Sequence, residues 1–477
     1  MTVHKITTPG LAINTYLLID PETRNGAVID ATRDIKPLIT LIEREGCSVT
    51  AILETHVHAD FISGSKELKS HLNEKTQIFC SSLGGKEWVS DYADQEVVDR
   101  QVISLGSLKI QAWHTPGHTP EHLMWVVFGE DINPQKAQLA FTGDFLLFGS
   151  LGRPDLLGEK ETRQLSEFLY ESVFSVLSQL PDSTVVYPAH GAGSLCGKSI
   201  SKQSSSTLEI ERQTNPFLVY MSQNEWIINL LKGMPKPPAY FARMKHLNIS
   251  GIPYLKTLIA PKELSAKAIV EWSHAKGVIL DLRSKEEFAS VHITGALSIP
   301  LQGSFVNWVS FVAPFGQPIA LIVNDLVSLD QALLQMRLVG LDNIQAFYIW
   351  DPALSRAFDG TVSAAPFVDP SEVMEKTANN NSSSIFKILD VRSAEEWDSG
   401  HIKNAIHCDL SSLNEQIGTL PHTGTYAVIC GSGYRASIAA SLLQNAGFPS
   451  LYNVAGGMSE WNKRGLPVVK ENEKTGI

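Results

Sequence analysis

Apolar runs alternate with amphipathic stretches in the C-terminal half of the chain, and this pattern occurs twice. Residues 279–300 (ILDLRSKEEFASVHITGALSIP) and 388–409 (ILDVRSAEEWDSGHIKNAIHCD) share I-L-D-x-R-S-x-E-E, an aromatic residue, H-I and a following Ala. In each copy a serine after Asp-x-Arg stands three residues before a glutamate, which is the pattern of a capping box that begins a helix. Residues 319–347 and 426–454 extend the match. Because alternating strands and helices form parallel sheets with helices on both faces, we predict two homologous α/β domains.

The N-terminal half has four short apolar or β-branched runs, and each is followed by a side chain that can bind a metal. The runs are residues 49–55, 108–113, 138–144, which ends in Asp144, and 184–191, which contains His190. Strand ends on one side of a sheet lie on one rim, so the side chains after them can converge. The side chains in question are His56, His58, Asp60, His114, His118, His122, Asp144 and His190.

Length and composition set the domain organisation. A chain of 477 residues is too long for one hydrophobic core. The prolines of residues 233–241 cannot continue a helix and suit a connector. We therefore predict an α/β multi-domain protein with domains at 1–240, 258–360 and 365–477.

Charge and hydropathy exclude several classes of partner. The net charge of −11 without a cluster of Lys or Arg argues against nucleic acid and anionic membranes. No apolar run approaches the roughly 18 residues of a membrane span, and the first residues lack a basic segment before an apolar core. Five scattered cysteines are too few for a disulfide framework. We expect a cytoplasmic homo-oligomer with free thiols.

Cys430 stands at a strand-to-helix turn that suits an anionic sulfur. It directly follows the apolar run 426–429 and begins the stretch CGSGYR, which leads into the helical pattern of 436–447. A helix N-terminus, a Gly-rich loop with inward N–H groups and an arginine five residues later all stabilise a thiolate or persulfide. The alternative is a buried core cysteine. The predicted site consists of Cys430, Gly431, Ser432, Gly433, Tyr434 and Arg435.

This second copy resembles the rhodanese (sulfurtransferase) family across its whole length, including residues 390–402 and 453–461 (NVAGGMSEW). The resemblance implies that Cys430 carries sulfane sulfur as a persulfide, cradled by the loop amides. Protein tyrosine phosphatases use a similar six-residue loop from Cys to Arg, but the flanking Asp-x-Arg and Gly-Gly segments favour the rhodanese. We expect Asp390 and Arg392 to form a structural salt bridge.

The first copy lacks the groups that sulfur transfer needs. Asn324 aligns with Cys430, and Leu329 aligns with Arg435. This copy therefore resembles the inactive rhodanese-like domains that act as spacers or docking surfaces. We assign no catalytic role to its Arg283 or His292.

The N-terminal domain resembles the metallo-β-lactamase superfamily over most of residues 1–230, and within it the persulfide dioxygenases and the glyoxalase II hydrolases. The resemblance implies an αββα sandwich. Hydrolases of this fold hold two zinc ions with the motif H-x-H-x-D-H, and the equivalent of Asp144 bridges the ions. In the stretch THVHADFISG (55–64), Phe61 occupies the place of the last His. One ligand of the second metal is thus lost, which favours a single metal.

Resemblance to the persulfide dioxygenases implies one ferrous iron held by His56, His118 and Asp144. Two His and one carboxylate leave three positions open, which suits a non-haem iron that activates O2. His58, Asp60 and His190 then surround the ligands, with zinc bound directly by His58 as the alternative.

The stretch LGRPDL (151–156) and a later cysteine supply three further candidates for the substrate site. Arg153 either positions an anionic sulfur species or pairs with Asp155. Cys196 lies in the Gly-rich stretch 190–198, which we expect to be exposed, and is either a reactive thiol or a bystander.

Together these features predict an enzyme of sulfide detoxification. The iron site would oxidise a low-molecular-weight thiol persulfide with O2 to sulfite, and Cys430 would pass sulfane sulfur to sulfite to give thiosulfate. Fusion raises the effective concentration of one product at the other site. The alternatives are a dinuclear zinc thioester hydrolase of the glyoxalase II type and a sulfur-relay scaffold without oxygenase activity. The sequence leaves open whether the thiol is coenzyme A, glutathione or another.

Overall fold

The computed structural model describes residues 1–234, 236–275, 277–353, 361–378 and 386–470. Their contacts group into two units, one of residues 1–258 with 336–340 and one of residues 259–335 with 341–477. The finer division at 1–240, 258–360 and 365–477 stays a prediction.

The first unit contains two six-stranded sheets. The first has the order β1 (Thr2–Thr8), β2 (Ile13–Ile19), β3 (Asn25–Ile29), β4 (Ser48–Leu53), β5 (Gln77–Ser81) and β6 (Gln95–Val97). The second has the order β14 (Ser206–Thr207), β13 (Val185–Pro188), β10 (Leu139–Gly143), β9 (Leu123–Phe128), β8 (Leu108–His114) and β7 (Val102–Leu105). Strands β3 to β6 run parallel, as do β10 and β13, whereas the remaining pairs of these two sheets are antiparallel.

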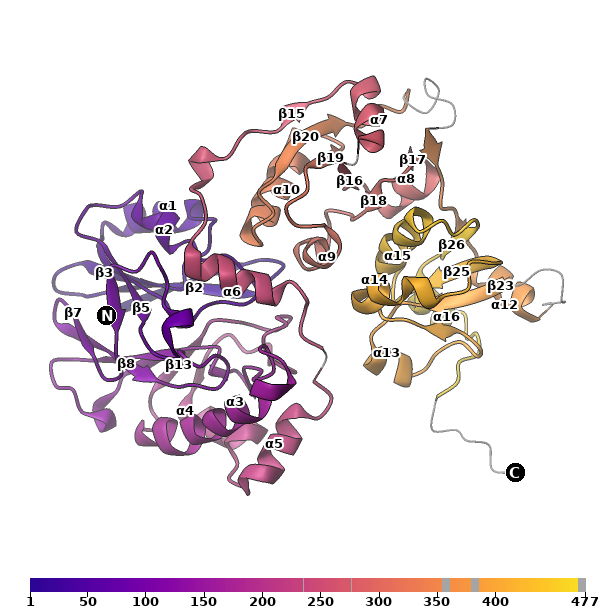
Figure 1. Ribbon diagram of the computed structural model, residues 1–477. Helices are drawn as coiled ribbons and strands as arrows, with labels where there is room; N and C mark the ends of the chain where they lie inside the picture. Colours follow the sequence, from indigo (N-terminus) through magenta and orange to yellow (C-terminus); the bar gives the residue numbers. More distant parts are fainter. Residues whose placement is uncertain (235, 276, 354–360, 379–385, 471–477) are drawn as a thin grey trace, which may run out of the picture. The chain divides into compact units, whose positions relative to one another are not determined.

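The two sheets face each other across a shared core. Leu18 and Ile29 of one sheet belong to the same buried cluster as Ile110 and Trp125 of the other. Helices α1 (Lys36–Glu45) and α2 (Ser65–Lys69) cover the outer face of the first sheet, and α3 (Glu159–Glu171), α4 (Leu208–Thr214) and α5 (Gln223–Leu231) lie against the second (Figure 1). Because both faces are covered, β9 is buried along its whole length, and its sequence LMWVVF is continuously apolar. The predicted αββα sandwich is confirmed.

The first unit also contains a short hairpin and a further helix. A hairpin of β11 (Leu146–Leu147) and β12 (Ser150–Leu151) follows β10. Helix α6 (Phe241–Ser250) follows α5 and buries Phe241, Met244 and Asn248.

The second unit contains two five-stranded parallel sheets. The first has the order β15 (Lys262–Glu263), β20 (Ile344–Ile349), β19 (Ile319–Val323), β16 (Val278–Asp281) and β18 (Leu297–Ser298). The second has the order β22 (Phe367–Val368), β26 (Leu451–Val454), β25 (Thr425–Ile429), β23 (Phe386–Asp390) and β24 (Ile406–His407). Strand for strand the order is the same, so the predicted duplication of a parallel α/β domain is confirmed. A separate two-stranded sheet pairs β17 (His292–Ile293) with β21 (Val362–Ser363).

Helices connect these strands. Among the described residues, the first copy contains α7 (Ala266–His274), α8 (Lys285–Ser290), α9 (Phe305–Val312) and α10 (Leu326–Leu338). Those of the second are α12 (Pro370–Ala378), α13 (Ala394–Asp398), α14 (Leu413–Gln416), α15 (Tyr434–Asn445) and α16 (Gly457–Lys463). Helices α8 and α13 begin with the predicted capping boxes, in which Ser284 pairs with Glu287 and Ser393 with Glu396.

Candidate functional site

Three buried side chains of the first unit converge at the rim of the sandwich. His56 follows β4, His118 lies between β8 and β9, and Asp144 follows β10. One ligand atom from each lies within 4.8 Å of the other two. Asp144 Oδ2 is 3.7 Å from His56 Nε2 and 3.5 Å from His118 Nε2. Loops from both sheets therefore bring together the three residues that the sequence selects.

Neighbouring groups fix which nitrogen of each histidine faces the cluster. The Nδ1 atom of His118 lies 2.9 Å from the carbonyl of Arg153, which can only accept, so Nδ1 carries the proton. The hydroxyl of Thr55 donates to Asp30, so it accepts from Nδ1 of His56 at 2.8 Å. Both Nε2 lone pairs are therefore directed at Asp144. Burial lowers the pKa of both histidines and keeps the imidazoles neutral.

The arrangement fits a metal ion. Among the described residues, His56 Nε2, His118 Nε2 and Asp144 Oδ2 are buried atoms without a hydrogen-bond partner. Three such atoms facing one another are costly to bury unless a cation shares them. Two neutral imidazoles and one carboxylate are a donor set that divalent transition metals accept.

His190 binds the oxygen of Asp144 that does not face the other two residues of the cluster. His190 Nδ1 lies 2.6 Å from Asp144 Oδ1, and its Nε2 lies 2.9 Å from Asp60 Oδ2. Burial opposes ionisation of Asp144, but the charge and hydrogen bond of His190 outweigh it and hold the pKa of the carboxyl below its usual value. Asp60, His190 and Cys196 also form a second buried group of metal-capable atoms.

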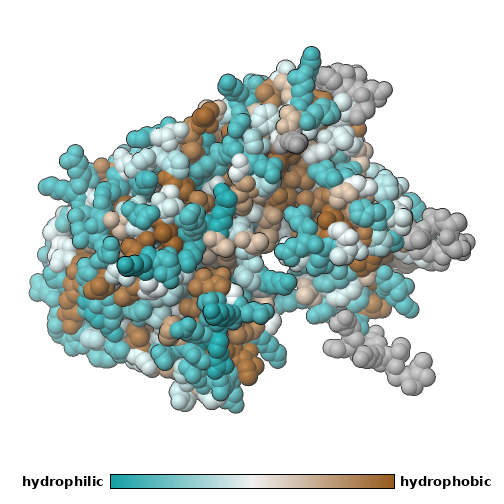
Figure 2. Space-filling view, viewed as in Figure 1, coloured by the Kyte–Doolittle hydropathy of each residue, from teal (hydrophilic) through white to brown (hydrophobic). Residues whose placement is uncertain are grey.

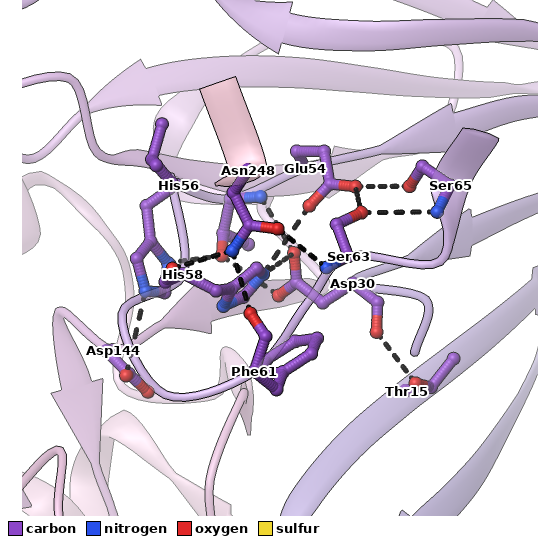
Figure 3. A network of polar contacts seen from close by, with 12 residues as sticks. Thr15, Asp30, Glu54, His56, His58, Phe61, Ser63, Ser65, Asp144 and Asn248 are labelled. Atoms are coloured by element: carbon purple, nitrogen blue, oxygen red, sulfur yellow. Dashed lines mark hydrogen bonds and ion pairs between the residues drawn. The ribbon is translucent and has the colours of Figure 1, made fainter. Parts of the chain in front are cut away.

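His58 turns away from the three residues and faces two other carboxylates (Figure 3). Its Nε2 lies 3.2 Å from Asp30 and 3.5 Å from Glu54. Burial alone would lower the pKa of His58, but the two carboxylates raise it to about 10. A protonated imidazole has no lone pair for a metal. The ring of Phe61 packs on it, with centroids 4.2 Å apart.

Asn248 of α6 ties down the loop that carries these residues, as Figure 3 shows. Its side-chain amide donates to the carbonyls of His58 and Phe61, both at 2.7 Å. Its Oδ1 accepts from the N–H of Ser63 at 2.8 Å. Glu121 holds the same loop from the other side by accepting from the N–H of Val57 at 2.7 Å.

Several of these supporting residues were missed by the sequence reasoning. Asp30 ends the apolar stretch GAVID and so carries the same signal as Asp144 at the end of β10. Glu54 lies within the run that precedes His56. For Asn248 no local signal exists.

The other two histidines of the stretch HTPGHTPEH lie outside the cluster. His122 Nε2 accepts from the backbone N–H of Asp144 at 3.2 Å and thereby positions that residue. His114 Nε2 lies 2.9 Å from the carbonyl of Pro120.

Arg153 and Cys196 are buried beside the cluster. The guanidinium of Arg153 pairs with both carboxylate oxygens of Asp155, at 2.7 and 2.8 Å. The expected exposure of Cys196 is wrong, because its side chain is 0% exposed, packed within a loop that folds back onto Arg153. Burial raises the pKa of the Cys196 thiol well above its ordinary value.

A pocket of about 190 Å³ lies beside the cluster. Val57 and Thr119, which directly follow His56 and His118, contribute to its wall. The remaining lining residues are mostly apolar and include one cation: Ala59, Trp88, Leu156, Leu157, Phe241, Ala242 and Lys245. The ammonium of Lys245 lies 3.5 Å from the centroid of the Trp88 ring.

In the second unit, Cys430 lies between the end of β25 and the start of α15. The N–H groups of Gly433 and Ala436 donate to its Sγ, at 3.1 and 3.4 Å. Gly431 and Ser432 complete the turn between Cys430 and Gly433. The sulfur is thus enclosed by loop amides.

The Arg435 guanidinium binds Glu396 through two hydrogen bonds, at 2.6 and 2.7 Å. Its charge is thereby largely neutralised by a residue of the capping box. The expected structural pair of Arg392 and Asp390 is present at 2.6 Å. The alignment of Asn324 with Cys430 is wrong by one residue. Asp281 pairs with Ile322 as Asp390 pairs with Ile429, so Val323 of the first copy takes the place of Cys430. Asn324 donates to Glu287 at 3.4 Å, and Leu329 is buried.

Within the residues that the structure describes, no helix is both long and apolar enough to cross a bilayer. Figure 2 shows hydrophilic and hydrophobic residues interspersed on the face in view.

Comparison with known proteins assigns families to both parts of the chain. Residues 8–190 match the metallo-beta-lactamase superfamily, and residues 369–464 match the rhodanese-like domain. The mitochondrial persulfide dioxygenase ETHE1 of Bos taurus is 33% identical over 229 residues, covering 47% of this chain and 78% of the relative. The hydroxyacylglutathione hydrolase GloC of Haemophilus influenzae is 28% identical over 234 residues, covering 46% and 98%.

A solved structure extends the likeness beyond the first unit. The crystal structure of a metallo-beta-lactamase from Staphylococcus aureus subsp. aureus COL superposes with a TM-score of 0.65 at 29% identity, and the match covers 73% of this chain and 98% of that one. The chain therefore belongs to the metallo-beta-lactamase superfamily, with an N-terminal domain homologous to the persulfide dioxygenases and a rhodanese-like domain fused behind it.

Proposed function

We propose that the N-terminal domain oxidises a low-molecular-weight thiol persulfide with O2 at one ferrous iron, and that the C-terminal domain transfers sulfane sulfur through Cys430. The overall first reaction is R–S–SH + O2 + H2O → R–SH + sulfite + 2 H⁺. The observation that carries the proposal is the buried set of His56, His118 and Asp144, whose three inward atoms lack partners among the described residues. Homologues that are persulfide dioxygenases support the same activity.

A bound ferrous ion would supply open positions for O2 and a sulfur anion and would accept and return electrons between them. The protein's own contribution is to fix the donors. Thr55 and the carbonyl of Arg153 keep both Nε2 lone pairs turned inward. His190 keeps Asp144 ionised, so the donor set carries one negative charge.

The pocket beside the cluster suits a thiol persulfide. Its mostly apolar lining suits the carbon skeleton of a small thiol, and Lys245 offers one cation to an anionic group of the substrate. Arg153 is held by Asp155, so we assign it the task of positioning His118 through its carbonyl.

Sulfur transfer needs no further oxidant, because the Cys430 thiolate takes the outer sulfur of a second persulfide R–S–SH, whose S–S bond breaks and releases the thiol R–SH. The lone pair on the sulfur of sulfite attacks the outer sulfur of the Cys430 persulfide, a new S–S bond forms, and the old S–S bond breaks. Cys430 leaves as a thiolate, and thiosulfate carries the sulfane sulfur away. The amides of Gly433 and Ala436 stabilise the sulfur anion before and after the step.

O2 uptake by the iron-loaded protein with persulfides of coenzyme A, glutathione and other small thiols tests the proposal. We expect uptake with at least one persulfide and about one iron per chain by elemental analysis. Two zinc ions per chain, together with no O2 uptake, would overturn it.

A dinuclear zinc thioester hydrolase is the second candidate. Asp60, His190 and Cys196 offer a second set of ligand atoms within 4.8 Å of one another, and homologues include hydroxyacylglutathione hydrolases. Hydrolysis of a glutathione thioester by the zinc-loaded protein would favour this candidate.

A further inference from the structure

We propose that the first rhodanese-like copy completes the sulfur-transfer site of the second by supplying Lys285, a cation that attracts the anionic sulfur acceptor. Lys285 would thus determine specificity for an acceptor such as sulfite without taking part in bond making. The inference rests on the proposed sulfur transfer at Cys430. It also gives the first copy a task that needs neither a thiol nor an arginine of its own.

The ammonium of Lys285 lies against the loop that encloses Cys430. Lys285 Nζ donates to the carbonyl of Ser432 at 2.7 Å. A Cβ atom built on Gly433 would lie 3.4 Å from the same Nζ. Gly433 is the residue whose N–H donates to Cys430 Sγ at 3.1 Å. The cation therefore stands beside the amide cradle of the sulfur.

Packing between the two copies holds Lys285 in this place. The hydroxyl of Tyr434, also in the Cys430 loop, donates to the carbonyl of Pro300 at 2.8 Å. Ser298 of β18 makes two buried contacts with α15, to Ser437 at 2.8 Å and to Ser441 at 3.0 Å. These bonds join one copy to the loop and helix of the other, so the position of Lys285 is part of a fixed interface.

The balance of charge at the loop makes this cation important. From the sequence we expect the positive charge of Arg435 to stabilise the sulfur anion at Cys430. In the structure Arg435 instead forms two hydrogen bonds to Glu396, whose negative charge offsets that of the guanidinium. Among the described residues, Lys285 forms an ion pair with Glu286, at 3.7 Å with 65% of the Glu286 side chain exposed, so solvent screens the pair. An ammonium has three donors, and Ser432 uses one.

The repeat itself shows that the lysine is particular to the first copy. In the aligned motifs R-S-K-E-E and R-S-A-E-E, Lys285 corresponds to Ala394. Each residue is the first of its helix, α8 or α13, directly after the capping serine. The position is thus open to substitution, and only the inactive copy places a cation there.

The proposed transfer step creates a need for such a cation. A sulfite dianion must approach a persulfide anion at Cys430, and like charges repel one another. A cation beside the loop lowers this repulsion and raises the local concentration of the acceptor. An uncharged acceptor gains much less from it.

The test compares a charged acceptor with an uncharged one. The full-length protein is loaded with sulfane sulfur at Cys430, and the loading is measured by intact mass. Transfer is then followed to sulfite and to tris(hydroxypropyl)phosphine, an uncharged acceptor that removes the outer sulfur as a phosphine sulfide. For Lys285→Gln we expect the ratio of the two rate constants, sulfite over phosphine, to fall about tenfold, equivalent to roughly 1.4 kcal/mol. Lys285→Arg should restore the ratio, and Glu286→Gln should raise it.

Salt provides a second measurement on the unmodified chain. The rate with sulfite should fall as salt rises, and Lys285→Gln should flatten this dependence. The matched control is Lys267→Gln, since Lys267 is an exposed lysine of the same copy; it should leave the ratio unchanged.

Two results would overturn the inference. Equal losses with both acceptors in Lys285→Gln would reduce Lys285 to a structural anchor of the loop, and an unchanged ratio would exclude any role in selecting the acceptor. If instead the unmodified chain fails to transfer sulfur from Cys430, the proposed function itself falls, and the inference falls with it.

Discussion

Asn248 offers the sharpest test of how the loop of residues 56–63 is held in place. Replacing it with Ala removes the partner of three backbone groups, the carbonyls of His58 and Phe61 and the N–H of Ser63. Asn248 is only 3% exposed, so these groups lie in a region that water reaches poorly. Each unsatisfied buried group costs about 1–3 kcal/mol. Taking about 1 kcal/mol for each, because water can enter the space left by the side chain, gives a loss of about 3 kcal/mol.

Differential scanning calorimetry of the full chain measures this loss. For a unit of this size, 1 kcal/mol shifts the melting temperature by about 2–4 °C, so the transition of the first unit should fall by about 6–12 °C. Asn248→Asp keeps the acceptor for Ser63 but loses both donors, so it too should destabilise. The matched control is Asn229→Ala on α5, whose exposed side chain donates a hydrogen bond to the sulfur of Met221 at 3.4 Å and holds no loop. A shift for Asn248→Ala no larger than that of the control would refute the reasoning.

Three further predictions concern the metal, the sulfur carrier and pH. Asp144→Ala should lose both the iron, by elemental analysis, and O2 uptake with persulfide, because the carboxylate balances the charge of the ion; retained uptake would contradict the ligand assignment. Cys430→Ser should still consume O2 but release sulfite in place of thiosulfate, whereas Asn324→Ala should leave the products unchanged, since an amide forms no persulfide; undiminished thiosulfate in the serine variant would point to another thiol. Despite partial burial, Arg435 lowers the pKa of Glu396 from 4.5 to about 2, so this pair stabilises the fold above pH 4.5 and loses its effect as pH falls towards 2. Glu396→Gln should therefore flatten the acid limb of stability, followed by denaturant unfolding at several pH values, and an equally steep limb would argue against the pair.

The repeated domains were the most predictable part of the fold. Both capping boxes and both parallel sheets follow from local signals, namely a serine three residues before a glutamate and apolar runs of strand length. Such signals depend on residues close in sequence, so they can be recognised without knowledge of the tertiary packing. The sandwich was predictable through resemblance, since its strands carry no comparable repeat.

The candidate metal site also has a part that the sequence predicts and a part that only the structure reveals. The ends of four strands point to eight metal-capable side chains, and the resemblance to the persulfide dioxygenases selects His56, His118 and Asp144 among them. The structure brings these three side chains together, while their role as iron ligands stays a prediction. The contacts of Asn248 span nearly 190 residues of sequence, so only the packing of α6 reveals them. The burial of Cys196 was equally hidden, because a Gly-rich stretch usually lies exposed and here it folds inward.

The burial of the cluster affects how the protein acquires its metal ion. His56, His118 and Asp144 are at most 4% exposed, so we expect an ion bound there to exchange slowly in the folded molecule. We therefore expect the ion found after purification to reflect the metals that the cell offered while the chain was being synthesised. A culture starved of iron should yield protein that stays mismetallated even when iron is later added to the buffer.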